Sequence, residues 1–595
     1  MASAWTPDTL RQSIERRTNE IIEMERDYQA RLKAAMELLA HEKQLLNSFQ
    51  PINRFPTEIL LRIFSYYLDA TKDSSNYSIN PFSSIHLTQV CTHWRLVTIE
   101  CPMLWNEVDL EWPLWTLEYL LRSKDTPLRV IYSDIWDGDI SATTRIFDFV
   151  LTQYTNRIQT MILRTHSQSV IDRLSAIPLH SSTLRHLELF SDSFQGIRLP
   201  IPDFFYRVLC TLKSIRILGL WAIENPLSVF RPNLHTLDLR CKPYSGNITM
   251  KGCIGALAQM PYLRNLSLVG VWDEQSVLGT VSRAALHDLS LLHIAGHSSH
   301  LCAFFLEHIE TASLTSITIF GDNCQSVRDF NRLSLSLSAI IKQSYRSIPA
   351  ARRLEVDYSC PADDLAISAW QSLDYWDAFL KFRTTYAEGF EGALTGDDLL
   401  SSLDLSKLEE YLVDLVDDSP PLPTFITHLP TIVMLSPSWL GLSTLPLLLM
   451  PVQGLDKKVP PIQPFPGLRT LDFESTGFDR IENQDEVLKR ITATFQMRTP
   501  IITPNEPFQI RCYKGNTQFP LLFNAIAKGI LSAYHRVLTE GAGEDMGWKL
   551  WFEYTVASEP QVKKVRGQIM DLIQHAWPFS ETDIPFGVTL ELWIE

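Results

Sequence analysis

The chain has 595 residues, of which 45% are apolar and 20% are charged, and its formal net charge is −15. This composition is ordinary for a globular protein and excludes a chain that is disordered throughout. The excess of acidic residues argues against nucleic acid or an anionic membrane as the main partner, because both attract concentrated basic surfaces. We therefore expect neither nucleic acid nor a membrane among its partners.

The N-terminal segment MASAWTPDTLRQSIERR lacks the apolar run of a secretory signal. The longest apolar run, LSTLPLLLMP at 442–451, is broken by proline and is well short of the roughly 20 residues that cross a bilayer. Nine cysteines without a CxxC pair are typical of reduced thiols. We expect a soluble protein of the cytoplasm, the nucleus or both.

Residues 8–50 are predicted to form one long amphipathic helix, because this segment is rich in strong helix formers and has no interior glycine or proline. The apolar side chains that take the a and d positions of a heptad are Leu10, Ile14, Ile21, Met24, Tyr28, Ala35, Leu38, Leu45 and Phe49. Arg17, Arg31 and Glu42 interrupt this seam. The pattern fits a marginal coiled coil and, equally, a solvated helix that packs back on its own protein.

Residues 51–106 read as a compact helical module that begins at Pro51 and contains the polar loop DATKDSSNYSINPFSS. In its first helix, Ile59, Leu60, Ile63 and Phe64 form an apolar stripe that follows a proline at the first helical position. Full burial of such side chains contributes about 1.5–3 kcal/mol each. A stripe of four is therefore enough to anchor a partner.

This module resembles the F-box family in its F-box-like form, through FPTEILLRIF at 55–64, VCTHWR at 90–95 and LW at 104–105. The resemblance implies docking on the Skp adaptor of an SCF-type cullin-RING ubiquitin ligase, with C-terminal repeats that hold a target protein. The adaptor-binding residues that it implies are Phe55, Pro56, Ile59, Leu60, Ile63, Phe64 and Trp94. Phe55 replaces the usual leucine, and the loop after Leu68 is longer than usual, which leaves adaptor contacts of that loop open.

A second interpretation of the same stripe is that it packs only against the helix with Val90, Trp94 and Val97, as most apolar helical stripes do. The motif in two parts favours adaptor docking over this interpretation.

Residues 107–375 carry recurring runs of the form L-x-x-L-x-L, which begin at Leu184, Ile215, Leu234, Leu263, Leu286 and Leu314. Weaker relatives occur near Ile158, Leu354 and Leu468. One such unit cannot bury its apolar edge, so neighbouring units must stack. The predicted fold class is α/β: an N-terminal helix and a small all-α module, followed by an irregular leucine-rich-repeat solenoid with a curved parallel sheet and helices outside.

Side chains alternate between the two faces of a strand, so the positions between the leucines are predicted to line one surface. By this count the surface residues are His186, Glu188, Phe190, Trp221, Asp238, Arg240, Asn265, Ser267, Asp288, Ser290, Thr318 and Phe320. Phe190, Trp221, Asp238 and Arg240 are the predicted target-binding residues, since interface energy concentrates in aromatic and arginine side chains. In the alternative, long returns or the C-terminal block cover this face.

The repeat signal fades at 376–466, a segment that reads as helical around LEEYLVDLVDD and then proline-rich. It returns at 467–595 with strands FQIRCY, WKLWFEY and VTLELWI, separated by two helical runs at 521–538 and 562–577. These elements are either final repeats that cap the solenoid or a small α/β domain.

No nucleotide-binding loop, metalloprotease motif or serine-hydrolase motif is present in the sequence. The run HIAGHSSHLC contains His293, His297, His300 and Cys302, which are zinc-ligand types, but it reads as a Gly-Ser loop with solvated histidines. We predict no metal, no cofactor and no catalytic residue, and hence a protein that is not an enzyme. Two functions remain: a substrate receptor of a ubiquitin ligase, or a non-ligase scaffold that uses the solenoid and the N-terminal helix.

Overall fold

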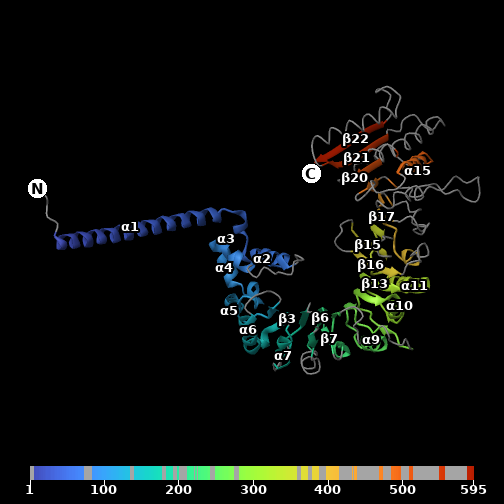
Figure 1. Cartoon of the computed structure of the whole chain (residues 1–595), viewed down its shortest axis with the longest axis horizontal. Coiled ribbons are helices and arrows are strands. Elements are labelled where there is room, and N and C mark those ends of the chain that lie inside the picture. Colours follow the sequence, from blue (N-terminus) through green and yellow to red (C-terminus); the bar gives the residue numbers. More distant parts are fainter. Residues whose placement is uncertain are drawn as a thin grey trace, which may run out of the picture. The chain divides into compact units, whose positions relative to one another are not determined.

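The computed structural model describes residues 6–72, 83–134, 140–165, 167–176, 183–191, 197–199, 211–219, 221–223, 226–241, 248–273, 280–357, 364–372, 378–386, 397–414, 432, 434–437, 468, 470–473, 484–497, 508–512, 525, 548–556 and 586–594. Its contacts divide the chain into two compact units, Met1–Arg185 and His186–Glu595. The division falls inside the predicted 107–375 segment. Figure 1 shows the helices and strands, coloured along the sequence.

The first unit opens with the helix α1 (Pro7–Ser48), over the segment where the sequence predicts a long helix. Thr6 caps its N-terminus: the Thr6 side chain accepts a hydrogen bond from the backbone N–H of Thr9, and the Thr9 side chain accepts one from the backbone N–H of Thr6. Pro7 occupies the first turn, where its missing N–H leaves no partner unsatisfied. No residue of α1 is buried, so the structure does not show this helix packed back on its own protein.

The helical module follows as η1 (Pro51–Arg54), α2 (Thr57–Lys72), α3 (Ser83–Val90), α4 (Thr92–Glu100) and η2 (Pro102–Trp105). Its buried apolar side chains are Leu60, Phe64, Ile85, Leu87, Val97, Leu104 and Trp105. The sulfur of Cys91 accepts the backbone N–H of Trp94 and so caps the N-terminus of α4 directly after the end of α3.

Three parallel strands complete the described part of the first unit: β1 (Glu107–Asp109), β2 (Leu128–Ser133) and β3 (Ile158–Arg164), with β2 between the other two. The helices α5 (Pro113–Arg122), α6 (Ile140–Gln153) and α7 (Gln168–Ala176) and the short turn η3 (Thr155–Arg157) alternate with them. This strand–helix alternation requires parallel pairing, because each helix carries the chain back to the same end of the sheet.

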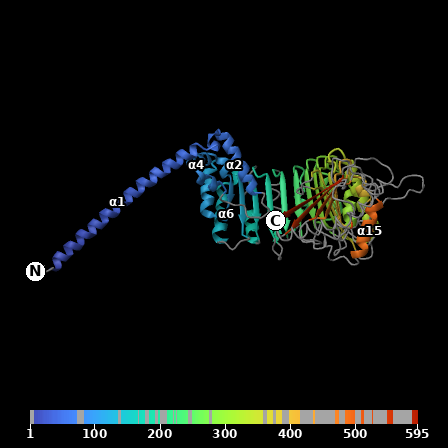
Figure 2. The same ribbon diagram turned by 90° about the horizontal axis from the view of Figure 1, so that it is seen from above.

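The second unit contains a mainly parallel sheet whose first strands pair with their neighbours in the sequence. These strands are β4 (His186–Ser191), β6 (Ser214–Gly219), β8 (Thr236–Arg240), β9 (Asn265–Val269), β11 (Leu291–Ser298) and β13 (Ser316–Cys324). Figure 2 shows them side by side. Two small pairs lie apart from this sheet: β5 (Ile197–Leu199) with β7 (Trp221–Ile223), and β10 (Ala284–Ala285) with β12 (Ile309–Glu310).

Strand register aligns the apolar residues of this sheet in rows. One row is Leu187, Ile215, Leu237, Leu266, Leu292 and Ile317, and the next is Leu189, Ile217, Leu239, Leu268, Ile294 and Ile319. All of these side chains are buried. The helices α9 (Met250–Leu257), α10 (Ser299–Glu307) and α11 (Val327–Gln343) follow the strands, and α10 and α11 pack on β13 at the face of these rows, where Gly321 meets Ser299 and Leu333.

The parallel order breaks after β13. The strands β14 (Arg353–Asp357), β15 (Asp364–Trp370) and β16 (Ala378–Tyr386) form an antiparallel meander, in which β16 returns beside β13 and β14 leads on to β17 (Glu410–Asp414). The prediction of a parallel sheet is wrong at β15, because this strand pairs antiparallel with both β14 and β16. The predicted helix around LEEYLVD is also wrong over Glu410–Asp414, because this run pairs with β14 as a strand.

Parallel pairing then continues through β18 (Met434–Pro437), β19 (Thr470–Phe473), β20 (Phe508–Cys512), β21 (Trp548–Val556) and β22 (Phe586–Ile594). The three predicted C-terminal strands correspond to β20, β21 and β22, and they extend the same sheet. The helices α12 (Asp397–Leu400) and α15 (Gln484–Met497) are described in this region. The predicted helical runs at 521–538 and 562–577 lie outside the described residues, apart from Ala525.

Candidate functional site

The two halves of the helical module are joined at Trp94. Its ring lies 4.7 Å from the ring of Phe64, centroid to centroid, which packs α4 against α2. Its indole Nε1 donates to Oδ1 of Asn53 at 2.6 Å. Asn53 Nδ2 in turn donates to the backbone oxygen of Asn47 at the end of α1. Trp94 therefore serves the interior of the module, as the sequence allowed, and remains half-buried.

A second tryptophan, Trp105, lies in the core at the C-terminal end of the module. Trp105 is fully buried, donates from Nε1 to the backbone oxygen of Thr98 at 2.7 Å, and packs edge-on against Tyr119. The guanidinium of Arg122 lies 4.3 Å from the Trp105 ring centroid, a cation–π contact. These contacts extend the module beyond residue 106 into α5.

The predicted apolar stripe divides into a buried half and an accessible half. Leu60 and Phe64 are fully buried within this chain, so they form the module core and are not surface contacts for an adaptor in this structure. The physical reason is that Phe64 packs on the ring of Trp94, and Leu60 lies one turn earlier on the same side of α2. The assignment of both as direct docking residues is corrected accordingly.

The accessible half of the stripe, Ile59 and the half-buried Ile63, adjoins Phe55 and Pro56, which directly precede α2. Phe55 is 46% exposed and Ile59 is 44% exposed, and Pro56 is exposed between them. Ile63, one turn after Ile59, is half-buried. Large apolar side chains left in water at a helix N-terminus mark a surface that gains free energy when a partner covers it.

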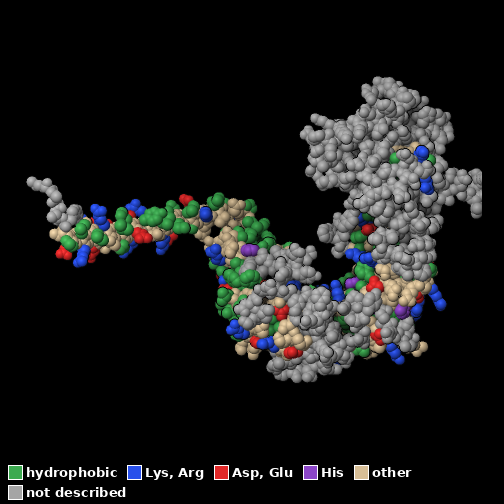
Figure 3. Space-filling model, viewed as in Figure 1, with side chains coloured by type: hydrophobic (Ala, Val, Ile, Leu, Met, Phe, Trp, Pro, Cys, Tyr) green, Lys and Arg blue, Asp and Glu red, His purple; other side chains and the backbone are tan. Residues whose placement is uncertain are grey.

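Further exposed apolar side chains on the module were missed by sequence reasoning: Val90, Leu96, Ile99 and Met103. The second interpretation of the sequence placed Val90 on the helix that packs against the stripe, but Val90 ends α3 and is 55% exposed. Leu96 and Ile99 are separated by three residues on α4, so helical spacing marks a second stripe beside the inward-facing Trp94 and Val97. Figure 3 shows hydrophobic side chains gathered over this region of the first unit.

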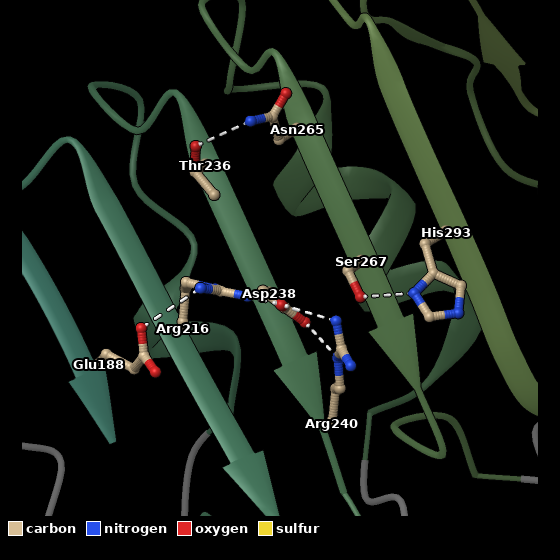
Figure 4. A network of polar contacts seen from close by, with 8 residues as sticks. All are labelled: Glu188, Arg216, Thr236, Asp238, Arg240, Asn265, Ser267 and His293. Carbon is tan, nitrogen blue, oxygen red and sulfur yellow. Dashed lines mark hydrogen bonds and ion pairs between the residues drawn. The ribbon is translucent and has the colours of Figure 1, made fainter. Parts of the chain in front are cut away.

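In the second unit, a polar row crosses the sheet on the face opposite α10 and α11. Register aligns Glu188, Arg216, Asp238, Ser267, His293 and Thr318 on β4, β6, β8, β9, β11 and β13. Figure 4 shows the first five of these with their neighbours on the strands.

Charges alternate along this row. Arg216 lies between two carboxylates, with Nη1 at 3.3 Å from Oε2 of Glu188 and Nε at 3.4 Å from Oδ2 of Asp238. Arg240 donates two hydrogen bonds to the same Asp238, from Nε to Oδ1 at 3.0 Å and from Nη2 to Oδ2 at 3.2 Å. Both arginine side chains are 43% exposed, whereas that of Asp238 is only 7% exposed. The buried carboxylate thus holds two guanidinium groups at the surface in fixed orientations.

The row continues with a neutral pair. Nδ1 of His293 lies 3.2 Å from Oγ of Ser267. Burial lowers the pKa of His293, and the charge of Arg240 lowers it further, so this imidazole is uncharged at neutral pH. On the neighbouring row, Asn265 Nδ2 donates to Oγ1 of Thr236 (Figure 4).

The structure places the four predicted target-binding residues in different positions. Asp238 lies in the charged row, Arg240 lies two residues further along β8 and is bonded to Asp238, and Phe190 is half-buried on β4, opposite Leu218. Trp221 is not part of this sheet, because β6 ends at Gly219 and Trp221 begins β7. Gly219 adopts φ +105°, and a Cβ there would meet the backbone oxygen of Ser191 at 1.7 Å, so only glycine can end β6 in this way.

Two members of the row, Arg216 and His293, were missed because two repeat frames were displaced. The buried residues of these repeats are Leu212, Ile215 and Ile217, and Leu289, Leu292 and Ile294. The sequence reading started the frames at Ile215 and Leu286 instead. It therefore assigned Asp288 and Ser290 to the sheet, although both precede β11. Frames that begin at Leu212 and Leu289 place Arg216 and His293 between the buried positions.

The run HIAGHSSHLC is not the predicted loop, since it forms the end of β11 and the start of α10. His297 is fully buried, stacks on Trp272 at 4.2 Å, and accepts the backbone N–H of Val271 at Nε2. Cys302 is buried in α10. Within the described part of the chain, no three His, Cys, Asp or Glu side chains are grouped to hold a metal ion.

An F-box-like family model matches residues 52–111. The comparisons with curated proteins and with solved structures give no match. Among the described helices, none combines the length and the apolar character that crossing a membrane requires. The chain thus carries an F-box-like domain at 52–111, together with a large and mostly parallel sheet.

Proposed function

We propose that this protein is a substrate receptor of an SCF-type cullin-RING ubiquitin ligase. The observation that carries the proposal is the F-box-like domain at 52–111, whose accessible apolar side chains gather at the start of α2. F-box domains generally bind the Skp adaptor of these ligases. Phe55, Pro56, Ile59 and the half-buried Ile63 are the proposed docking residues, with Leu60, Phe64 and Trp94 supporting them from inside.

The second unit is proposed to be an irregular leucine-rich-repeat solenoid that binds the target protein. Its support is the buried rows of leucine and isoleucine, which recur in the pattern L-x-x-[LI]-x-[LI] from Leu184 to Ile319. The charged row on the opposite face is the proposed recognition surface. Arg216 and Arg240 are held by Asp238, so binding a carboxylate or carbonyl group of the target costs little ordering entropy.

In this proposal the protein is not an enzyme. It supplies proximity: the target is held near the ubiquitin-loaded enzyme, and the ligase partners carry out the transfer. Its partners are the Skp adaptor, the cullin-RING ligase and one target protein, with no nucleic acid, membrane or cofactor.

Co-purification of the full chain with a Skp adaptor tests the proposal. The wild type should retain the adaptor, and Pro56→Ala/Ile59→Ala should lose most of it. Leu114→Ala is a matched control, since Leu114 is 86% exposed on α5, outside the proposed docking residues. If the adaptor is absent from all samples, or equally bound by all, the receptor function is excluded.

A second candidate is a scaffold that does not join a ligase and that assembles through α1. The exposed apolar stripe of α1 favours it, because no side chain of this helix is buried. The same co-purification decides between the two candidates.

A further inference from the structure

The long helix α1 presents an apolar stripe to solvent along its whole length. Its 42 residues span about 63 Å at roughly 1.5 Å per residue. The exposed fractions are 63% for Ile14, 59% for Ile21, 63% for Tyr28 and 61% for Leu38. Figure 3 shows hydrophobic side chains interspersed with charged ones along the helix. A stripe of this length in water marks an interaction surface.

The three charged residues on the stripe decide which partner fits. In a parallel pair of identical helices, equivalent a and d residues face each other. Arg17 would then meet Arg17, Arg31 would meet Arg31, and Glu42 would meet Glu42, each in the seam. Glu20 at a g position would also face Glu25 at the e position of the other helix. A parallel dimer of this sequence is therefore disfavoured by repulsion at four places.

In an antiparallel pair, a residues face d residues, and one register resolves these conflicts. When residue numbers of the two copies add to about 59, Arg17 of one copy faces Glu42 of the other, twice by symmetry. Arg31 faces Tyr28, whose ring suits a guanidinium. Arg31 also retains its ion pair with Asp27 of the same helix, in which Nη2 lies 2.8 Å from Oδ2. The remaining seam layers are all apolar: Leu10 with Phe49, Ile14 with Leu45, Ile21 with Leu38, and Met24 with Ala35.

The flanking positions agree with the same register. At the g positions, Glu20 faces His41 and Asp27 faces Ala34, and at the e positions, Glu25 faces Leu32. The other flanking pairs are Ser13 with Ser48, Arg11 with Leu46, and Thr18 with Leu39. No like charges oppose each other, and Leu32, Leu39 and Leu46 widen the apolar seam.

We propose that α1 pairs with α1 of a second copy of this chain as an antiparallel coiled coil centred between Gln29 and Ala30. The interruptions Arg17 and Glu42, which weaken the stripe of a single helix, then form the ion pairs that fix direction and register. Because η1 follows α1 directly, the two F-box-like modules begin at opposite ends of the paired helices. This goes beyond the receptor function and does not depend on it.

Charge-reversal variants of the full chain test the pairing by mass in solution, for example by sedimentation equilibrium at one fixed concentration. Wild type should have the mass of two chains. Arg17→Glu places Glu opposite Glu42, and Glu42→Arg places Arg opposite Arg17, so each variant should have the mass of one chain. Arg17→Glu/Glu42→Arg restores opposite charges and should return to two chains. None of these changes touches a buried side chain, so the folded units remain intact.

Arg16→Glu and Glu37→Arg are the matched controls, because both residues lie at c positions on the outer side of the helix. Both should remain dimeric. A parallel dimer would respond differently, because residue 17 would face residue 17 and residue 42 would face residue 42. Either single reversal would then leave like charges opposed, as in wild type, and the double variant would restore no ion pair. A monomeric wild type, dimeric single variants, or a monomeric double variant each overturns the proposal.

Discussion

Nε1 of Trp94 donates a hydrogen bond to Oδ1 of Asn53, 2.6 Å away and 41 residues earlier in the chain. Asn53 also donates to the backbone oxygen of Asn47, so one amide connects the end of α1, the turn η1 and the helix α4. The F-box-like motif in two parts is thus joined by a polar contact that neither part shows alone.

Loss of this amide should destabilise the module. Asn53→Ala leaves the Trp94 indole without its acceptor, and we expect the free energy of unfolding of the first unit to fall by about 1–3 kcal/mol. Asn47→Ala is the matched control, since only its backbone oxygen takes part in the contact. Urea unfolding followed by tryptophan fluorescence measures both, and equal stability of the two variants would contradict this role.

Alanine substitutions at a core position and at a surface position of the α2 stripe should have different effects on the free energy of unfolding. Phe64→Ala removes a fully buried ring from Trp94, so the free energy of unfolding should fall by about 3–5 kcal/mol. Ile59→Ala should change it by less than about 1 kcal/mol, because that side chain is 44% exposed. Denaturant midpoints of the full chain give both values. A large loss for Ile59→Ala would place it in the core as well.

A buried carboxyl group gives the first unit a pH dependence. Burial raises the pKa of Asp109 to about 6, partly offset by the backbone N–H of Glu111, which donates to Oδ1 at 3.0 Å. A raised carboxyl pKa means that folding favours the protonated form, so this contribution to stability is complete below pH ~4 and is lost as the pH rises to ~6.

Asp109→Asn keeps an acceptor for the Glu111 N–H and carries no charge. We expect this variant to be more stable than wild type at pH 7, by no more than about 3 kcal/mol, and to show a flatter stability curve between pH 4 and 6. Thermal unfolding at several pH values measures this. The exposed Asp125→Asn is the control and should follow wild type. A wild-type curve for Asp109→Asn would show that this carboxyl is not desolvated.

The charged row of the sheet should depend on Asp238 more than on its arginines. Asp238→Asn leaves Arg240 without the carboxylate that it grips with two bonds, while Arg216 keeps Glu188. Stability should fall by about 1–3 kcal/mol, whereas Arg240→Gln, which removes an exposed partner, should cost less. Hydrogen exchange of β8 amides reports the difference locally. Equal protection in both variants would show that the row is not organised by the buried carboxylate.

Local patterns predicted those parts of the fold in which each element repeats its neighbour. The buried leucines at Leu184, Leu234 and Leu263 mark their strands correctly, because position in an L-x-x-L-x-L run determines burial. The frames near Ile215 and Leu286 were displaced by three residues, since isoleucine and leucine at adjacent candidate positions fit two frames equally well. That displacement hid Arg216 and His293.

Other features depend on contacts that no local pattern contains. The antiparallel meander of β14, β15 and β16 is specified by the pairing of β16 with β13, which are separated by more than fifty residues. Likewise, the apolar stripe of α2 has the same sequence pattern whether Phe64 faces Trp94 or a partner. Only the folded module shows that Leu60 and Phe64 are buried, the latter against Trp94 of α4, and that Ile59 is exposed.

The affinity of the full chain for a purified Skp adaptor tests the central claim most directly, by titration calorimetry on wild type, Ile59→Ala and Leu117→Ala. Covering the 44% of Ile59 that is exposed is worth about half of the ~1.5–3 kcal/mol of full burial, so Ile59→Ala should weaken binding roughly 3- to 10-fold. Leu117→Ala, at an exposed position of α5, should bind as wild type does. Adaptor binding that is undetectable in wild type, or unchanged by Ile59→Ala, would contradict a docking surface at the start of α2.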